Sequence, residues 1–251
     1  MTTVHRGRIV KAFDKAASSY EQAAIVQKIT AEKFAEWLGV RLEKTPQHII
    51  EVGCGTGFLT RRLKYLYPAS IYLATDISSA MLEMCKQSCQ TFSCMEWLAC
   101  DAETHRFNTP CDLLVSNLTF QWFQSFATAL TNLAIQCEHL AFTTLIAGSF
   151  IEWQSVYQAA DVASGIHDYP SVEAIELMVH HQLSGYQFHY KIVEEKQTFS
   201  DALDFLRSLK SIGAVIPCAY YQPVQLRTIL RRAPQPFTVT YRILYGSLQK
   251  I

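Results

Sequence analysis

Three acidic residues stand at or near the ends of short apolar runs, where they are well placed to bind a polar small molecule. They are Glu51 in residues 47–52, Asp76 after Ser70–Thr75 and Asp101 at the end of the run Met95–Cys100. Short runs rich in branched or aromatic residues predict buried strands of a parallel sheet. Because parallel strands end at one edge of a sheet, we expect the three acids to lie around one crevice.

Three alternate glycines follow the first acid, in the order Gly53-Cys54-Gly55-Thr56-Gly57. Glycine allows a positive φ and has no Cβ, so the backbone of such a turn can approach a ligand closely. A dinucleotide-binding turn places its third glycine three residues after its second, and Phe58 occupies that position here. The turn therefore favours a ligand without a pyrophosphate, and a purely structural turn is the alternative.

Asp76 lies nineteen residues after Gly57, at the end of the second predicted strand. A carboxylate at that position can accept hydrogen bonds from both hydroxyls of a ribose, although a helix-capping aspartate is the alternative. Asp101 is similarly placed to accept the exocyclic amine of an adenine, the backbone N–H of Ala102 can serve a ring nitrogen, and Ile77 can cover one face of the base.

Polar and aromatic side chains follow the fourth predicted strand, Asp112–Asn117. Asn117, Gln121 and Trp122 can line a small pocket at the same edge of the sheet, although Trp122 is equally compatible with a core position. Tyr20 follows a polar break, Ser18-Ser19, between two predicted helices within residues 6–39. It can fold over the ligand as part of a lid, or lie half-buried between the helices.

The remaining elements complete an α/β fold. Helical spacing predicts a helix over residues 57–66, ended by Pro68, a second helix that begins at Ser78 or Ser79, and a small helical insertion over residues 150–183. Further strands are predicted at Leu140–Leu145, Tyr186–Val193 and Phe237–Tyr245, and a further helix at Asp201–Lys210. Seven strands with helices between them predict a Rossmann-like, doubly wound sheet.

Composition narrows the class of protein. The 251 residues are 49% hydrophobic with zero net charge, yet no acid follows Asp204, and that region holds Arg207, Lys210, Arg227, Arg231, Arg232, Arg242 and Lys250. The eight cysteines form no C-x-x-C pair, so we predict reduced thiols in a cytoplasmic protein and no metal site. The N-terminus lacks the apolar core of a signal peptide, and no apolar run reaches the ~18 residues that span a membrane.

The cofactor turn resembles the first motif of class I S-adenosylmethionine (SAM) methyltransferases, and the whole chain resembles the malonyl-acyl carrier protein O-methyltransferases of biotin synthesis. The more specific segments of this resemblance are Ser116-Asn117-Leu118 with Gln121-Trp122, Phe142-Thr143-Thr144-Leu145, and Leu206-Arg207-Ser208-Leu209-Lys210 with Ile212-Gly213. The chain departs from the family in lacking a Pro-Gly turn before the fifth strand, at Gln136–His139.

The resemblance implies a SAM-dependent carboxyl O-methyltransferase that esterifies the free carboxylate of a malonyl thioester. The partner would be a malonyl-loaded acyl carrier protein, with no nucleic acid and no membrane. The implied cofactor residues are Tyr20, Glu51, Gly53, Gly55, Gly57, Asp76, Ile77, Met81, Asp101, Ala102 and Asn117. Tyr20, Gln121, Trp122, Arg207 and Lys210 would act at the substrate. One domain is expected, divided into a lid (1–45), a cofactor half (46–146), a helical cap (147–185) and a C-terminal half (186–251).

Two other functions remain open at this point. A methyltransferase of another small carboxylate or of a quinone precursor would use the same cofactor residues. A non-catalytic nucleotide-binding adaptor would keep the fold alone, and two acids aimed at a ribose and an adenine argue against it. A carboxylate, with a reference pKa of about 4, is ionised at neutral pH and needs no general base. The lack of an evident dyad for general-base catalysis is therefore consistent with the methyltransferase hypothesis.

Overall fold

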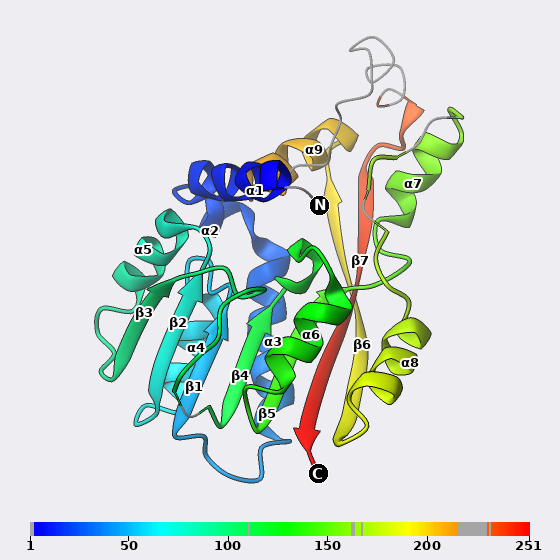
Figure 1. Cartoon of the computed structure of the whole chain (residues 1–251). Helices are drawn as coiled ribbons and strands as arrows, with labels where there is room; N and C mark the ends of the chain where they lie inside the picture. Colours follow the sequence, from blue (N-terminus) through cyan, green and yellow to red (C-terminus); the bar gives the residue numbers. More distant parts are fainter. Residues whose placement is uncertain (1–2, 110, 162–163, 167, 215–229, 231) are drawn as a thin grey trace.

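The computed structural model describes residues 3–109, 111–161, 164–166, 168–214, 230 and 232–251. Within that part of the chain, seven strands form one sheet in the order β3-β2-β1-β4-β5-β7-β6 (Figure 1). The strands are β1 His48–Val52, β2 Ile71–Asp76, β3 Met95–Ala99, β4 Leu113–Asn117, β5 His139–Leu145, β6 Tyr186–Phe199 and β7 Phe237–Lys250. This order confirms the doubly wound sheet that the sequence predicts.

The five strands β1 to β5 run parallel, and β7 runs antiparallel to both of its neighbours, β5 and β6. The strand order reverses at β1 and β4, which pair directly. Open α/β sheets bind ligands outside the carboxyl ends of the strands at such a reversal, because the chain leaves the two strands toward opposite faces. The geometry therefore places the expected site beyond the ends of β1, β2 and β4.

Helices cover both faces of the sheet (Figure 1). One core includes buried residues of α3 Ile25–Gly39, α4 Phe58–Leu66 and α5 Ser79–Ser88, and the other includes those of α6 Phe126–Ala134 and α8 Val172–Gln182. Neighbouring strand residues alternate between the two, so Val115 belongs to the first core and Leu114 to the second. All seven residues of β5 are buried. None of the described helices has both the length and the apolar character needed to span a membrane.

The first helix of the N-terminal segment lies across the carboxyl ends of the strands, whereas α3 covers one face of the sheet (Figure 1). The prediction of two helices was wrong, because the segment contains α1 Thr3–Ala16, α2 Tyr20–Ala23 and α3. The predicted break before Tyr20 is present. A second break occurs at Ala24, where φ −86° and ψ 52° interrupt the helical path. Tyr20 therefore begins a single helical turn held between two longer helices.

The C-terminal strands β6 and β7 are each 14 residues long, well beyond their predicted lengths. They pair from Tyr186 opposite Lys250 to Phe199 opposite Phe237, so one continuous antiparallel hydrogen-bond ladder runs along the full length of both strands. The predicted insertion is confirmed as α7 Ile151–Gln158 and α8, and Ser171 caps α8. Helix α9 Ala202–Ser211 follows β6.

Candidate active site

The glycine turn joins β1 to α4 at the centre of the sheet. Gly53, Gly55 and Gly57 have φ values of 71°, 55° and 96°, which disfavour any residue with a Cβ. A Cβ on Gly53 would lie 2.3 Å from Thr119 Oγ1, so the turn also packs tightly against the chain that leaves β4. Gly53 and Gly55 line a cavity of about 790 Å³. Gly57 begins α4, and a Cβ there would lie 2.8 Å from the Sγ of Cys85.

Asp76 lies on the wall of the same cavity and is 9% exposed. Its Oδ2 accepts the N–H of Gly55 at 2.9 Å, and its Oδ1 accepts the N–H of Ser78 at 2.8 Å. Ser78 is the helix cap, because its Oγ accepts the N–H of Met81. Each oxygen of Asp76 keeps acceptor capacity for a ligand. Burial raises the pKa of Asp76 to about 6, so it is mostly ionised at neutral pH.

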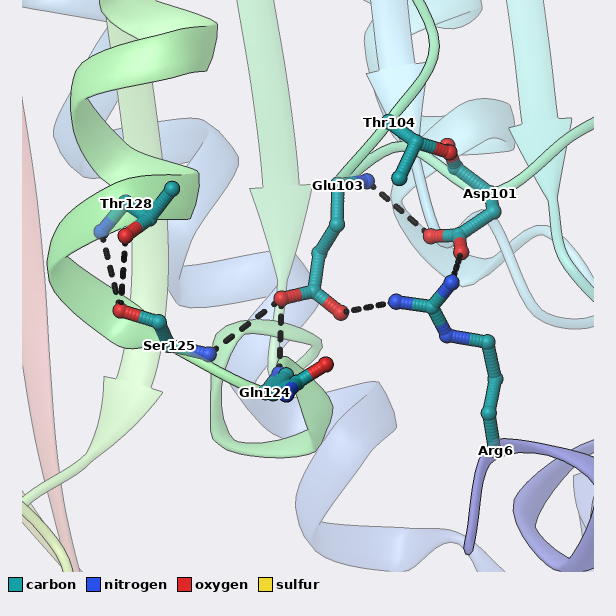
Figure 2. Close-up of polar contacts among 7 residues, drawn as sticks. All are labelled: Arg6, Asp101, Glu103, Thr104, Gln124, Ser125 and Thr128. Carbon is teal, nitrogen blue, oxygen red and sulfur yellow. Dashed lines mark hydrogen bonds and ion pairs between the residues drawn. The ribbon is translucent and has the colours of Figure 1, made fainter. Parts of the chain in front are cut away.

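A pair of carboxylates, Asp101 and Glu103, follows β3 and lines the same cavity (Figure 2). Asp101 Oδ1 accepts the backbone N–H of Glu103 at 3.1 Å, and Asp101 Oδ2 pairs with Arg6 of α1. Glu103 Oε2 accepts a hydrogen bond from Arg6 at 3.1 Å. Arg6 was not a candidate in the sequence analysis, where nothing in the N-terminal segment indicated that its first helix would reach β3.

The first cavity brings together most of the predicted cofactor residues. Tyr20, Gly53, Gly55, Asp76, Ile77, Met81, Asp101, Ala102 and Asn117 all line it. Glu51 and Gly57 are not among the described lining residues. Glu51 is buried behind the turn, where Thr60 and Tyr72 donate to its carboxylate, and burial raises its pKa to about 7. The geometry gives Glu51 a positional role, and its contact with a cofactor stays a prediction.

A second cavity, of about 690 Å³, adjoins the first. Phe13, Tyr20, Leu118 and Trp122 line both, and we call these four residues the neck. Leu118 has a φ of 49°, a conformation that is strained for a leucine and is often found at functional sites. A sequence shows no signal for such a conformation, and Leu118 was not predicted as a site residue.

The described lining of the second cavity contains no Asp, Glu, Lys, Arg or His. Its polar members are Gln27, Gln121, the neck residues Tyr20 and Trp122, and the pair Tyr169 and Tyr241. Burial raises the pKa of each of these three tyrosines well above its usual range, and the charge of Asp76 adds to the effect at Tyr20. The phenols are therefore neutral at any ordinary pH.

Gln121 is held by the chain that leaves β4. It lies in η1 Phe120–Trp122, and its Nε2 donates to the carbonyl oxygen of Leu118 at 2.6 Å. Its Oε1 is buried and has no hydrogen-bond partner among the described residues. Asn117 is fixed more fully, since its Nδ2 donates to Gln27 O and its Oδ1 accepts from Thr143.

Arg207 and Lys210 lie on the exposed face of α9, opposite Phe205 and Leu209. Neither is among the described residues that line the two cavities. The structure therefore does not bring these predicted substrate-binding cations to the neck. Of the C-terminal cations considered in the sequence, Arg232 is exposed, and Arg227 and Arg231 lie outside the described residues.

Comparisons with known proteins agree with this architecture. Residues 49–136 match a family described as "Methyltransferase domain". A malonyl-acyl-carrier protein O-methyltransferase of Magnetococcus marinus is 34% identical, with 96% of this chain and 91% of the relative covered. This chain belongs to the family of malonyl-acyl-carrier protein O-methyltransferases. The corresponding protein of Salmonella typhimurium is 30% identical, with both chains fully covered.

A solved structure of the plantazolicin methyltransferase BpumL in complex with SAH has the same fold as this member of the family. Its TM-score is 0.59 and its identity is 17%, with 98% of this chain and 96% of that chain covered. A likeness at that level of identity supports the fold alone. The first cavity nevertheless suits a nucleoside on its own geometry, because Gly53 and Gly55, which have no Cβ, lie beside a buried carboxylate with free acceptor capacity.

Proposed function

We propose that this protein transfers the methyl group of SAM to the free carboxylate of a malonyl thioester. The observation that carries the proposal is the pair of cavities joined at the neck: an acid-lined cavity on one side and a cavity with no described charged side chain on the other. The family's name supplies the substrate class, since the Magnetococcus marinus relative is named for malonyl-acyl-carrier protein.

The residues of the first cavity fit the proposed cofactor. Asp76 would accept the ribose hydroxyls with its remaining acceptor capacity, and Gly53 and Gly55 bring the backbone of the turn to the cavity wall. Asp101 and the backbone of Ala102 would meet the adenine. SAM supplies an activated methyl group on a positively charged sulfur, which is complementary to the excess of acids in this cavity.

The second cavity suits a carboxylate that acts as the nucleophile. A cation beside that carboxylate would stabilise the ground state and lower its reactivity, because its charge disappears as the methyl group is transferred. None of the described lining residues supplies such a cation. The tyrosines stay neutral, so the protein needs only to hold the reacting atoms about 3 Å apart and to exclude water at the neck.

One experiment tests the assignment directly. Purified protein with labelled SAM would be given malonyl carrier protein, malonyl coenzyme A and a panel of free dicarboxylates. We expect label on the malonyl thioesters. Label on free acids alone would support a methyltransferase of another small carboxylate, and SAM binding without any product would support a non-catalytic adaptor.

The carrier protein would dock through electrostatic attraction. Arg8, Lys11 and Lys15 share the exposed face of α1, opposite the face that carries Arg6 and Phe13. No ion pair engages these three residues or the α9 cations Arg207 and Lys210 among the described residues. The segment that links α1 to α2 meets the end of α9, where Ser19 Oγ donates to Ser211 O at 3.1 Å. Acyl carrier proteins are acidic helical domains, so this surface is complementary to them.

Reversing the charges of the α1 face tests this docking surface. The variant R8E/K11E/K15E should lower kcat/KM for malonyl carrier protein about tenfold at low salt, with little change for malonyl coenzyme A. The control K44E/K86E/K196E makes the same change in net charge with exposed lysines elsewhere. Equal losses in the two variants, or equal losses for the two substrates, would contradict the location. Docking through the C-terminal cations would be tested with R232E.

A further inference from the structure

Glu103 joins three separate segments of the chain (Figure 2). Its Oε1 accepts the consecutive backbone N–H groups of Gln124 and Ser125, at 2.7 and 3.3 Å. Its Oε2 accepts from Arg6 of α1 at 3.1 Å. Glu103 itself follows β3, and Ser125 caps α6. One carboxylate therefore holds α1 against both the β3 turn and the loop that carries Trp122.

Arg6 is the only cation among the described residues that line the first cavity. The same face of α1 contributes Ile9 and Phe13 to that cavity, and Phe13 packs edge-on against Trp122 with ring centroids 5.3 Å apart. At its other end α1 is held through Asp14, which accepts from Ser78 Oγ at 2.6 Å. The N-terminal end of α1 thus depends on Arg6 for its charged contacts with the sheet.

We propose that Arg6 and Glu103 form a latch that holds α1 closed over the adenosine end of the first cavity, with Glu103 as its permanent anchor. This inference rests on the proposed function, because it assumes that the first cavity binds SAM. Both residues are positioning residues. They act by retaining the cofactor and have no part in methyl transfer.

The two acids that contact Arg6 differ in how firmly they are held. Glu103 has two backbone donors on its other oxygen and a side chain that is 13% exposed, so its carboxylate is fixed before Arg6 arrives. The Oδ2 of Asp101 faces Arg6 and accepts no hydrogen bond from any other described residue. An adenine amine can therefore take the place of Arg6 at Asp101 while Arg6 stays bound to Glu103.

The latch predicts a specific effect on cofactor retention. Opening α1 requires breaking a partly exposed, charge-assisted contact, so loss of either partner should speed ligand release. In the variants R6A and E103Q we expect the dissociation rate of S-adenosylhomocysteine and its Kd to rise about tenfold, as measured by tryptophan fluorescence and calorimetry. R6K should recover part of the loss, because lysine keeps the charge but offers a single contact point. The control is R106A, which removes an exposed arginine that does not line the first cavity.

Two further measurements separate the latch from simple loss of stability. The double variant R6A/E103Q should release ligand no faster than either single variant, because both remove the same contact. In the ligand-free protein, hydrogen exchange should increase in α1 for R6A and stay unchanged in α6, which Ser125 still caps. The difference in Kd between R6A and the parent protein should shrink in high salt, since the contact is partly exposed.

The binding measurements distinguish failure of the latch from failure of the proposed function. Unchanged or tighter binding in R6A would overturn the latch and would mean that Arg6 only competes with the ligand for Asp101. Additive losses in the double variant would also overturn it. Failure of the parent protein to bind S-adenosylhomocysteine would instead overturn the proposed function, and the latch with it.

Discussion

The two cavities share a neck but differ sharply in charge. The described lining of the first contains three acids, Asp76, Asp101 and Glu103, and a single cation, Arg6. The second has no charged side chain among its described lining residues, although it is about as large. A net negative cavity attracts and orients a cationic cofactor, whereas a neutral one leaves the charge of an anionic substrate unopposed until it meets that cofactor. Under the proposed function, the charged cavity would bind the cofactor, and the neutral cavity would hold the reacting carboxylate without a counter-charge.

The largest expected effect comes from removing the acid at the centre of the charged cavity. The variant D76A should raise the Kd for SAM about 100-fold, because two charge-assisted hydrogen bonds to the ribose are lost. Calorimetry measures the effect directly. D76N keeps the shape of the side chain and one acceptor oxygen, so it should lose less affinity than D76A. Its amide nitrogen would face the backbone N–H of Gly55 or Ser78, so circular dichroism should accompany the binding measurement.

The matched control for this variant is Glu83→Ala, which removes an exposed acid from α5 near the same cavity. Its SAM affinity should stay unchanged. If D76A bound SAM within threefold of the parent protein, the first cavity would not be the nucleoside site, and the contrast between the cavities would lose its meaning.

A charge introduced into the neutral cavity should have the next largest effect. In Gln121→Lys, the ammonium can still donate to Leu118 O and can also pair with the substrate carboxylate. That pairing favours the ground state over the transition state, so kcat should fall about 30-fold while the KM for the malonyl thioester falls or stays constant. Steady-state kinetics with saturating SAM separates the two constants.

Gln121→Met serves as the control for this experiment, because it has a similar length and no charge. Its loss of kcat should be small by comparison, reflecting only the contact with Leu118. A rise in kcat for the lysine variant would show that substrate positioning by a cation limits the reaction.

The pH dependence of binding sharpens the same contrast. Burial raises the pKa of Asp76 to about 6, so the carboxylate that accepts the ribose hydroxyls gains a proton as the pH falls through that value. SAM affinity should therefore be constant above about pH 7 and fall about tenfold per pH unit below about pH 6. The ordinary α-carboxyl and α-amino pKa values, about 3.5 and 8, lie outside this window. In D76N the slope between pH 5 and 7 should be much smaller, and an unchanged slope would assign the titration to another group, with Glu51, whose pKa is about 7, as the first candidate.

The sequence predicted the charged cavity better than the neutral one, for a physical reason. Asp76, Asp101 and the glycines are fixed by local rules, because a strand end and a tight turn place them wherever the sheet forms. The strand order of the parallel sheet then determines which of these residues lie next to each other. Nine of the predicted cofactor residues accordingly line the first cavity.

The second cavity depends on contacts between distant segments. Leu118 and Phe150 adopt positive φ values, and Ile166, Tyr169 and Leu209 meet there from elements that are far apart in the chain. The guanidinium of Arg207 suits a substrate carboxylate, but helical periodicity places it on the side of α9 opposite Leu209. Which side of α9 is buried depends on its packing against α2, β6 and Trp153 of α7, and these contacts form between segments that are distant in the sequence.

The smallest expected effect concerns the neck itself, where Tyr20 lines both cavities. The ring separates the compartments from water, and the hydroxyl stays protonated because burial and the nearby charge of Asp76 raise its pKa far above its usual range. Tyr20→Ala should therefore lower kcat/KM about tenfold, whereas Tyr20→Phe should lower it only about twofold. The exposed Tyr65 of α4 provides the control, Tyr65→Ala, which should have no effect. Equal losses in the alanine and phenylalanine variants would mean that the hydroxyl positions the reacting groups, and the neck would then be a polar contact site as well as a barrier between two differently charged cavities.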